Sequence, residues 1–162
     1  ALSIAYYLKW NHSKGSDNPK ETRSNYRRAE AQAPTNSQLM AMLSRYEITH
    51  ILIPQLVELG RDIDSVNDRG LSVLSVLVSE GNLPSAKRIL RHGANPNHRG
   101  GSQEISPLMI AVLTGNLEMV KLLLEYEADV SQLLPDGNQL EGWARANGLD
   151  SIADLISTGY RT

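Results

Sequence analysis

The stretch EGNLPSAKRILRHGANPN (residues 80–97) recurs, with substitutions, as TGNLEMVKLLLEYEADVS (residues 114–131). Gly81 aligns with Gly115, and the offset of 34 residues is constant along the whole stretch. A repeat of this length indicates one supersecondary unit that is stacked several times. Each such unit buries its apolar face only against its neighbours. The pattern therefore favours an extended binding surface over an enclosed active site.

Two weaker copies continue the repeat on either side. NGLDSIADLI (residues 147–156) follows the second copy with a spacing of 33 residues, and LVELGRDIDSVND (residues 56–68) precedes the first copy with the same spacing. Four copies are enough for a stable stack, because terminal repeats are normally atypical.

Composition indicates one small globular domain. The chain has 162 residues, of which 41% are hydrophobic and 21% charged, and its formal net charge is only −2. That charge does not match nucleic acid. There is no Phe, so Leu, Ile, Val and Ala form the core, which suits the packing of helix against helix. There is also no Cys, which excludes disulfides, thiolate catalysis and cysteine zinc sites.

The N-terminal segment differs from the rest in charge. Residues 1–34 contain six Lys/Arg and three Asp/Glu, whereas the remaining residues contain ten and fifteen. ALSIAYYLKW (residues 1–10) is too short to span a bilayer. We interpret it as an amphipathic helix that packs on the repeats; the alternative is the end of a longer apolar segment in a processed or truncated chain. Membrane contact is expected only through this N-terminal segment, and the compartment stays open: cytoplasmic, or periplasmic or secreted.

A second short helix is expected from Asn18, as N-cap, to about Ala33. Its Arg23, Arg27 and Arg28 share one face. We interpret this face as solvated; the alternative is contact with acidic lipid or an acidic partner.

From residue 37 onward the pattern predicts helix, tight turn, helix and long loop. In the second repeat we expect helices over 72–80 and 83–92, and in the third over 106–114 and 117–126. The turn between each pair holds a glycine, which adopts left-handed backbone angles without strain. The stack predicts a core that contains Leu74, Leu90, Leu108, Ala111, Val120 and Leu123.

These repeats resemble the ankyrin repeat family. SPLMIAVLTGNLEMVKLLLEYEADV (residues 106–130) nearly matches the full family consensus, and GLSVLSVLVSEGNLPSAKRILRHGANPN (70–97) is also close. DGNQLEGWARANGLDSIADLI (136–156) is similar to a divergent last repeat, and LMAMLSRYEITHILIPQLVELGRDI (39–63) to a worn first one. The resemblance covers about residues 37–157. It implies an all-α ankyrin-repeat solenoid, a helix-turn-helix-loop stack.

The chain is expected to divide into two parts. Residues 1–36 would be an N-terminal helical extension or linker, and residues 37–162 the ankyrin repeat domain.

The chain departs from the family pattern at three places. Glu127 replaces the glycine that normally ends the second helix, so this cap should be weaker. Pro54 falls in the middle of the second helix of the first repeat and should kink it. The loop HRGGSQE (residues 98–104) is one residue longer than usual, and Gly100-Gly101 is expected to give a looser, projecting finger.

No catalytic or cofactor motif is present in the sequence. GLSVL (residues 70–74) is not a nucleophile elbow, because Ser72 occupies the helix-opening position, and the four histidines do not fall at helical i, i+4 spacing. We expect no enzyme activity, no metal and no cofactor. Trp143 aligns with Ile110 and is interpreted as core, with an exposed anchor as the alternative.

The resemblance also implies where a partner would bind. In this family the loop tips and the inner face of each first helix line a concave surface. The corresponding residues here are Tyr46, Glu47, Asp68, Arg69, Leu71, Ser79, Glu80, Arg99, Gln103, Ile105, Leu113, Thr114, Asp136 and Asn138. Tyr46, Leu71, Ile105 and Leu113 are apolar or aromatic where solvent is expected, so we predict an apolar interaction patch. The alternative is that some of them cover neighbouring fingers.

The resulting hypothesis is a non-enzymatic module, an adaptor or scaffold that is monomeric alone and binds one partner protein through its concave face. The alternative is a dedicated inhibitor or immunity protein that neutralises a partner toxin or enzyme. The sequence does not identify the partner.

Overall fold

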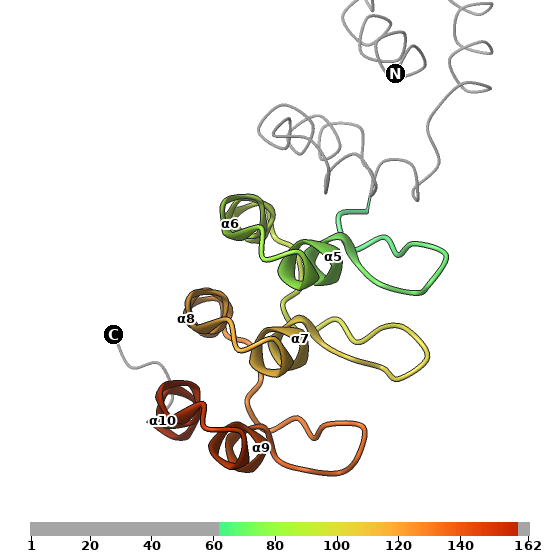
Figure 1. Ribbon diagram of the computed structural model, residues 1–162. Coiled ribbons are helices and arrows are strands. Elements are labelled where there is room, and N and C mark those ends of the chain that lie inside the picture. The colour runs from blue at the N-terminus through green and yellow to red at the C-terminus, as the bar shows by residue number, and fades with distance from the viewer. Residues whose placement is uncertain (1–61, 159–162) are drawn as a thin grey trace, which may run out of the picture. The chain divides into compact units, whose positions relative to one another are not determined.

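The computed structural model describes residues 62–158. Within this range six helices form three successive pairs, as Figure 1 shows. The first helices of the pairs form one layer and the second helices another. The helices are α5 (Val73–Ser79), α6 (Leu83–Arg91), α7 (Pro107–Leu113), α8 (Leu117–Glu125), α9 (Leu140–Ala146) and α10 (Asp150–Thr158).

Each pair is preceded by a short hairpin, which we call a finger. Fingers 1, 2 and 3 are closed by the isolated antiparallel bridges Val66–Ser72, Gly100–Ile105 and Leu133–Gln139. Within residues 62–158 these bridges are the only β-structure, which confirms the predicted all-α stack for this part of the chain. The predictions for the N-terminal extension, for Pro54, and for Tyr46 and Glu47 lie outside the described residues.

Side-chain caps explain where the helices begin. The buried hydroxyls of Ser72 and Ser106 accept hydrogen bonds from the backbone N–H groups of Ser75 and Met109. Asn82 and Asn116 cap α6 and α8 in the same way. Such a bond satisfies one of the N–H groups that a helix start leaves without a partner. The predicted helix boundaries are therefore confirmed to within a residue at each end.

Glycine makes the turn between the helices of each pair. Gly81 and Gly115 both have φ of +68°. The N–H that follows each of them donates back into the first helix, as from Asn82 to the carbonyl oxygen of Leu77 at 2.9 Å. A left-handed residue here lets α6 reverse direction and pack on α5, which confirms the role expected of the repeated glycine.

The predicted core is confirmed. Leu74, Leu90, Leu108, Ala111, Val120 and Leu123 are all at most 3% exposed. They come from both layers of helices, so the interior is continuous through the stack rather than confined to one pair.

Hydrogen bonds between the loops fix the register of neighbouring repeats. The carboxylate Oδ1 of Asp64 accepts from the backbone N–H of Asn95 at 2.9 Å, and one repeat later Oδ1 of Asn97 accepts from the N–H of Asp129 at 2.7 Å. Asp129 in turn accepts from the hydroxyl and the N–H of Ser131, and these bonds lower its pKa. A short polar side chain, Asp64 or Asn97, therefore links each of these loops to the next one.

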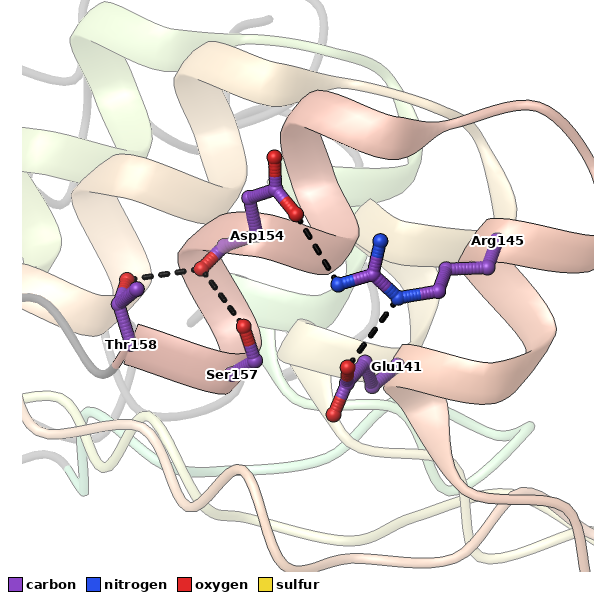
Figure 2. Close-up of polar contacts among 5 residues, drawn as sticks. All are labelled: Glu141, Arg145, Asp154, Ser157 and Thr158. Atoms are coloured by element: carbon purple, nitrogen blue, oxygen red, sulfur yellow. Dashed lines mark hydrogen bonds and ion pairs between the residues drawn. The ribbon is translucent and has the colours of Figure 1, made fainter.

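The last helix pair has a polar outer side. Arg145 donates to Glu141 at 3.2 Å and to Asp154 at 3.0 Å, so its ion pairs link α9 to α10 (Figure 2). These two hydrogen bonds raise the pKa of Arg145. By the repeat spacing, Glu141 and Arg145 occupy the positions of the buried Leu108 and Val112. A polar outer face of this kind is typical of a terminal, capping repeat.

Substitutions in the core should test this packing. Leu108→Ala should lower the free energy of unfolding by about 2–5 kcal/mol, because it leaves a cavity between fully packed helices. Ala111→Leu should cost about 1–3 kcal/mol through overpacking. Chemical denaturation measures both, with the exposed Glu125→Ala as the control. Losses below about 0.5 kcal/mol at both core sites would contradict the register.

A substitution at the end of α8 should instead raise the stability of the fold. Glu127 has φ of +61° at the position where Gly93 has +91°. Because a side chain is unfavourable at such angles, Glu127→Gly should raise the free energy of unfolding by about 0.5–1 kcal/mol. Gly93→Ala should lower it, although no atom lies within 4 Å of the added methyl group. Thermal unfolding would count against this explanation if both substitutions changed stability in the same direction.

Candidate protein-docking surface

The first helices of the three pairs expose a row of apolar side chains. Val76, Ile110 and Trp143 occupy equivalent positions on α5, α7 and α9 and are all half-buried. One turn beyond Ile110, Leu113 is 39% exposed. Since neighbouring helices in this layer pack in order (Figure 1), equivalent positions lie next to one another. We call these four residues the inner stripe.

Trp143 is thus neither fully core nor a fully exposed anchor. Its neighbour in α9, Ala144, is completely buried, whereas Trp143 is half-buried. The interpretation of Trp143 as a core residue is therefore only partly right. Trp143 therefore belongs partly to the interior and partly to the surface of α9.

Most of the predicted partner-binding residues in the described range are exposed. The structure exposes Asp68, Arg69, Arg99, Gln103, Asp136 and Asn138 at the fingers and Ser79, Glu80, Leu113 and Thr114 at the ends of the first helices. Leu71 and Ile105 are only half-buried, which differs from the exposed patch expected from the sequence. Leu71 is close to finger 2: its Cδ2 would lie 3.4 Å from a Cβ built on Gly101. It therefore covers a neighbouring finger, the alternative that the sequence left open.

Several of the exposed polar groups already bond within their own repeat. The hydroxyls of Ser79 and Thr114 donate to carbonyl oxygens one turn back in α5 and α7. Asp136 accepts from the backbone and the side chain of Asn138 at 3.1 and 2.8 Å, and these bonds lower its pKa. Such groups shape the fingers first, and a partner would have to compete with bonds already made.

Finger 2 is not the loose projection that its two glycines suggested. The N–H of Gly101 donates to the carbonyl oxygen of Gly70 at 3.1 Å, and a Cβ on Gly100 would overlap that same oxygen. The glycines are thus needed for close approach to finger 1, since no side chain fits between the two backbones. Fingers 1 and 2 form one joined surface.

A side chain supports the tip of finger 2. Glu104 has φ of +48°, whereas the equivalent Gly70 and Gly137 have +75° and +83°. Nε of Arg99 donates to the carbonyl oxygen of Glu104 at 3.0 Å. Arg99 is exposed as predicted, but part of its guanidinium group holds this unfavourable backbone in place.

Two exposed apolar residues of the fingers were not predicted from the sequence. Val66 and Leu133 are 41% and 48% exposed and lie at equivalent positions of fingers 1 and 3, where finger 2 has Gly100. The repeat spacing could have identified them, because aliphatic residues are unusual in a solvent-facing loop. They add exposed apolar side chains to fingers 1 and 3.

Other kinds of site are not found in residues 62–158. No group of three or more His, Cys, Asp or Glu side chains in this range could hold a metal ion. No helix in the same range combines the length and the apolar content that crossing a membrane requires.

Comparison with known families matches the geometry described above. A family model for ankyrin repeats in three copies matches residues 39–133, more than half of the chain. The chain belongs to the ankyrin repeat family. The match begins within the sequence predicted as a worn first repeat, and the helix pair α9 and α10 adds a further unit after it.

Similar ankyrin repeat proteins come from distant organisms. An ankyrin repeat protein of Fowlpox virus is 30% identical over 108 residues, which are 66% of this chain and 17% of the relative. The ARF GTPase-activating protein Git of Drosophila melanogaster is 34% identical over 83 residues, 51% of this chain and 11% of Git. Ankyrin repeat and SOCS box protein 14 of Mus musculus is 34% identical over 85 residues, 47% of this chain and 14% of the mouse protein.

The chain thus spans less than a fifth of the length of each of these relatives. Ankyrin repeats generally mediate protein–protein interaction and are typically not enzymatic, and no catalytic family is indicated for this chain.

The contact between fingers 1 and 2 can be tested with two Gly→Ala changes. Gly100→Ala should lower the free energy of unfolding by about 1–3 kcal/mol, because the methyl group displaces the backbone of Gly70. Gly142→Ala, inside α9 with no atom within 4 Å, should instead stabilise by about 0.5–1 kcal/mol. Thermal unfolding of both variants decides: an unchanged stability for Gly100→Ala would mean that the fingers do not pack together in solution.

Proposed function

We propose that this chain is a non-enzymatic adaptor or scaffold module that binds one partner protein through the inner stripe and the neighbouring fingers. The observation that supports this most is the inner stripe, in which the half-buried Val76, Ile110 and Trp143 lie beside the exposed Leu113. Exposed apolar groups that lie next to one another and are bordered by charged residues are typical of interaction sites.

The composition of the stripe suits a binding interface. An aromatic side chain held by its own fold loses little conformational entropy on binding, and such residues usually contribute most of the interface energy. Trp143 and Leu113 are the best candidates for that role, and the exposed Arg69 and Glu80 supply polar groups for a rim.

The remaining parts of the proposal follow the sequence. Residues 37–162 would form the repeat domain and residues 1–36 a separate extension. The domain would be monomeric until its partner binds. The basic face of Arg23, Arg27 and Arg28 is the alternative binding site, because residues 1–34 are basic whereas the rest of the chain is acidic.

The adaptor and the inhibitor hypotheses predict different effects on the activity of the partner. A partner captured from the source organism by the wild-type chain, but not by a Leu113→Glu variant, identifies what the stripe binds. If that partner is an enzyme, its activity at saturating concentrations of this chain separates the two: unchanged activity supports an adaptor, and abolished activity an inhibitor.

Truncation of the stripe should weaken binding, and at the exposed Leu113 it should do so with little change in stability. Leu113→Ala or Trp143→Ala should cost about 1–4 kcal/mol of binding free energy, measured by calorimetry with the captured partner. Glu118→Ala and Lys121→Ala on α8, on the other layer of helices, should be nearly silent.

Deletion of residues 1–34 provides the opposite control. Binding that is lost with this deletion, and is unaffected by the changes at Leu113 and Trp143, would refute the inner stripe as the site.

A further inference from the structure

Helix α6 presents only positive charge to solvent. Its buried face contains Ser85, Ala86, Ile89 and Leu90. Lys87 and Arg91 are exposed and Arg88 is half-buried on the other side, and the exposed His92 follows as C-cap. The spacing makes two i, i+4 pairs, Lys87 with Arg91 and Arg88 with His92, so each pair lies on one side of the helix. We call these four residues the basic patch.

The equivalent helices of the next two repeats are different. On α8, Lys121 is bound to Glu118 at 2.8 Å, and Glu125 follows in the last turn. In α6 the corresponding positions of these two glutamates are Pro84 and Arg91. On α10 the charged residues are Asp150 and Asp154. Counting Lys, Arg, Asp and Glu within the helices, α6 has +3, α8 −1 and α10 −2.

Within residues 62–158 no ion pair neutralises the basic patch. The ion pairs of this range are Lys121–Glu118, Arg145–Glu141 and Arg145–Asp154, all on α8, α9 and α10. Lys87 and Arg91 are like charges at i, i+4 spacing and repel each other, and the negative end of the helix dipole offsets only part of that repulsion in the last turn. An external anion would both relieve the repulsion and gain charge-assisted hydrogen bonds.

We propose that the basic patch on α6 is a second docking site, which binds a short acidic segment of a protein. Guanidinium groups pair with carboxylates through two parallel hydrogen bonds, and this chemistry fits Arg88 and Arg91. The patch extends over about 6 Å of helix between residues 87 and 91. It therefore accommodates a few neighbouring carboxylates.

The surroundings of the patch favour a short acidic segment over a long polyanion or a membrane. α8 packs beside α6, and α10 beside α8, in the same layer (Figure 1). An extended phosphate backbone or a flat anionic lipid surface on α6 would also approach α8 and α10, whose charged residues sum to −1 and −2. A short segment avoids them. The site lies on the other layer of helices from the inner stripe and shares no residue with it.

The test uses a fluorescein-labelled peptide of alternating Glu and Gly, with an alternating Gln and Gly peptide as the neutral control. Fluorescence anisotropy at low ionic strength measures binding to the full chain. The double variant Lys87→Gln/Arg91→Gln should bind the acidic peptide about tenfold more weakly, because two charge-assisted contacts are lost. Added salt should weaken binding to the wild type more than to this variant.

A matched control removes the same charge elsewhere. Lys121→Gln/Arg145→Gln also takes away two positive charges, but both are already paired with carboxylates, so it should bind like the wild type. Leu113→Ala should bind the acidic peptide unchanged, which separates this site from the inner stripe. Circular dichroism and thermal unfolding confirm that each variant is folded.

Three results would overturn the proposal. The acidic peptide could bind no better than the neutral one. The control double variant could lose as much affinity as the α6 variant, which would reflect net charge alone. Poly-uridylate or phosphatidylserine vesicles could bind the wild type more tightly than the peptide and lose that affinity in the α6 variant, which would assign the patch to phosphate groups.

Discussion

The whole structure depends on burial between neighbouring repeats. A pair of helices as short as α7 and α8 cannot bury its own apolar face, so Leu108 and Met119 become fully buried only because other pairs pack against theirs. Stability is then a sum of contributions from each pair and each interface between pairs. The polar positions Glu141 and Arg145 in α9 follow from the same constraint, since apolar residues there would leave an exposed interface.

The backbone devices that set this stacking are separate from the surfaces that it displays. Turn glycines such as Gly81 and Gly115, capping side chains such as Ser106 and the loop bonds of Asp64 and Asn97 fix how each pair meets the next. None of them requires a particular side chain at the exposed positions of α5, α7 and α9 or on the outer helices. The family can therefore keep one architecture and vary its binding surfaces.

The sequence predicted the helices, their caps and the core well, because each repeats at a fixed spacing and each depends on local chemistry. It predicted the fingers poorly, because their packing depends on neighbours that are about 30 residues away. Gly100 and Gly101 predicted a loose tip, but in the structure they permit a close backbone contact with Gly70. The sequence predicted an exposed Leu71, but this side chain packs against finger 2. Val66 and Leu133 were missed because they lie in loops, outside the helical pattern of apolar residues, although the repeat spacing places them at equivalent positions.

Positions at which the repeats disagree are therefore the most informative about function. Where the fold needs a residue, as at Leu74 and Leu108 or at Ser72 and Ser106, the two repeats before the capping one both keep it. Stacking alone does not explain why Ser79 is replaced by an exposed Leu113, or why α6 is basic where α8 pairs Lys121 with Glu118. An exposed leucine and an unneutralised cluster of cations are both unfavourable in isolation. A partner that covers the first or a carboxylate that pairs with the second removes that cost. The two surfaces thus have the same physical reason to bind, on opposite layers of one stack.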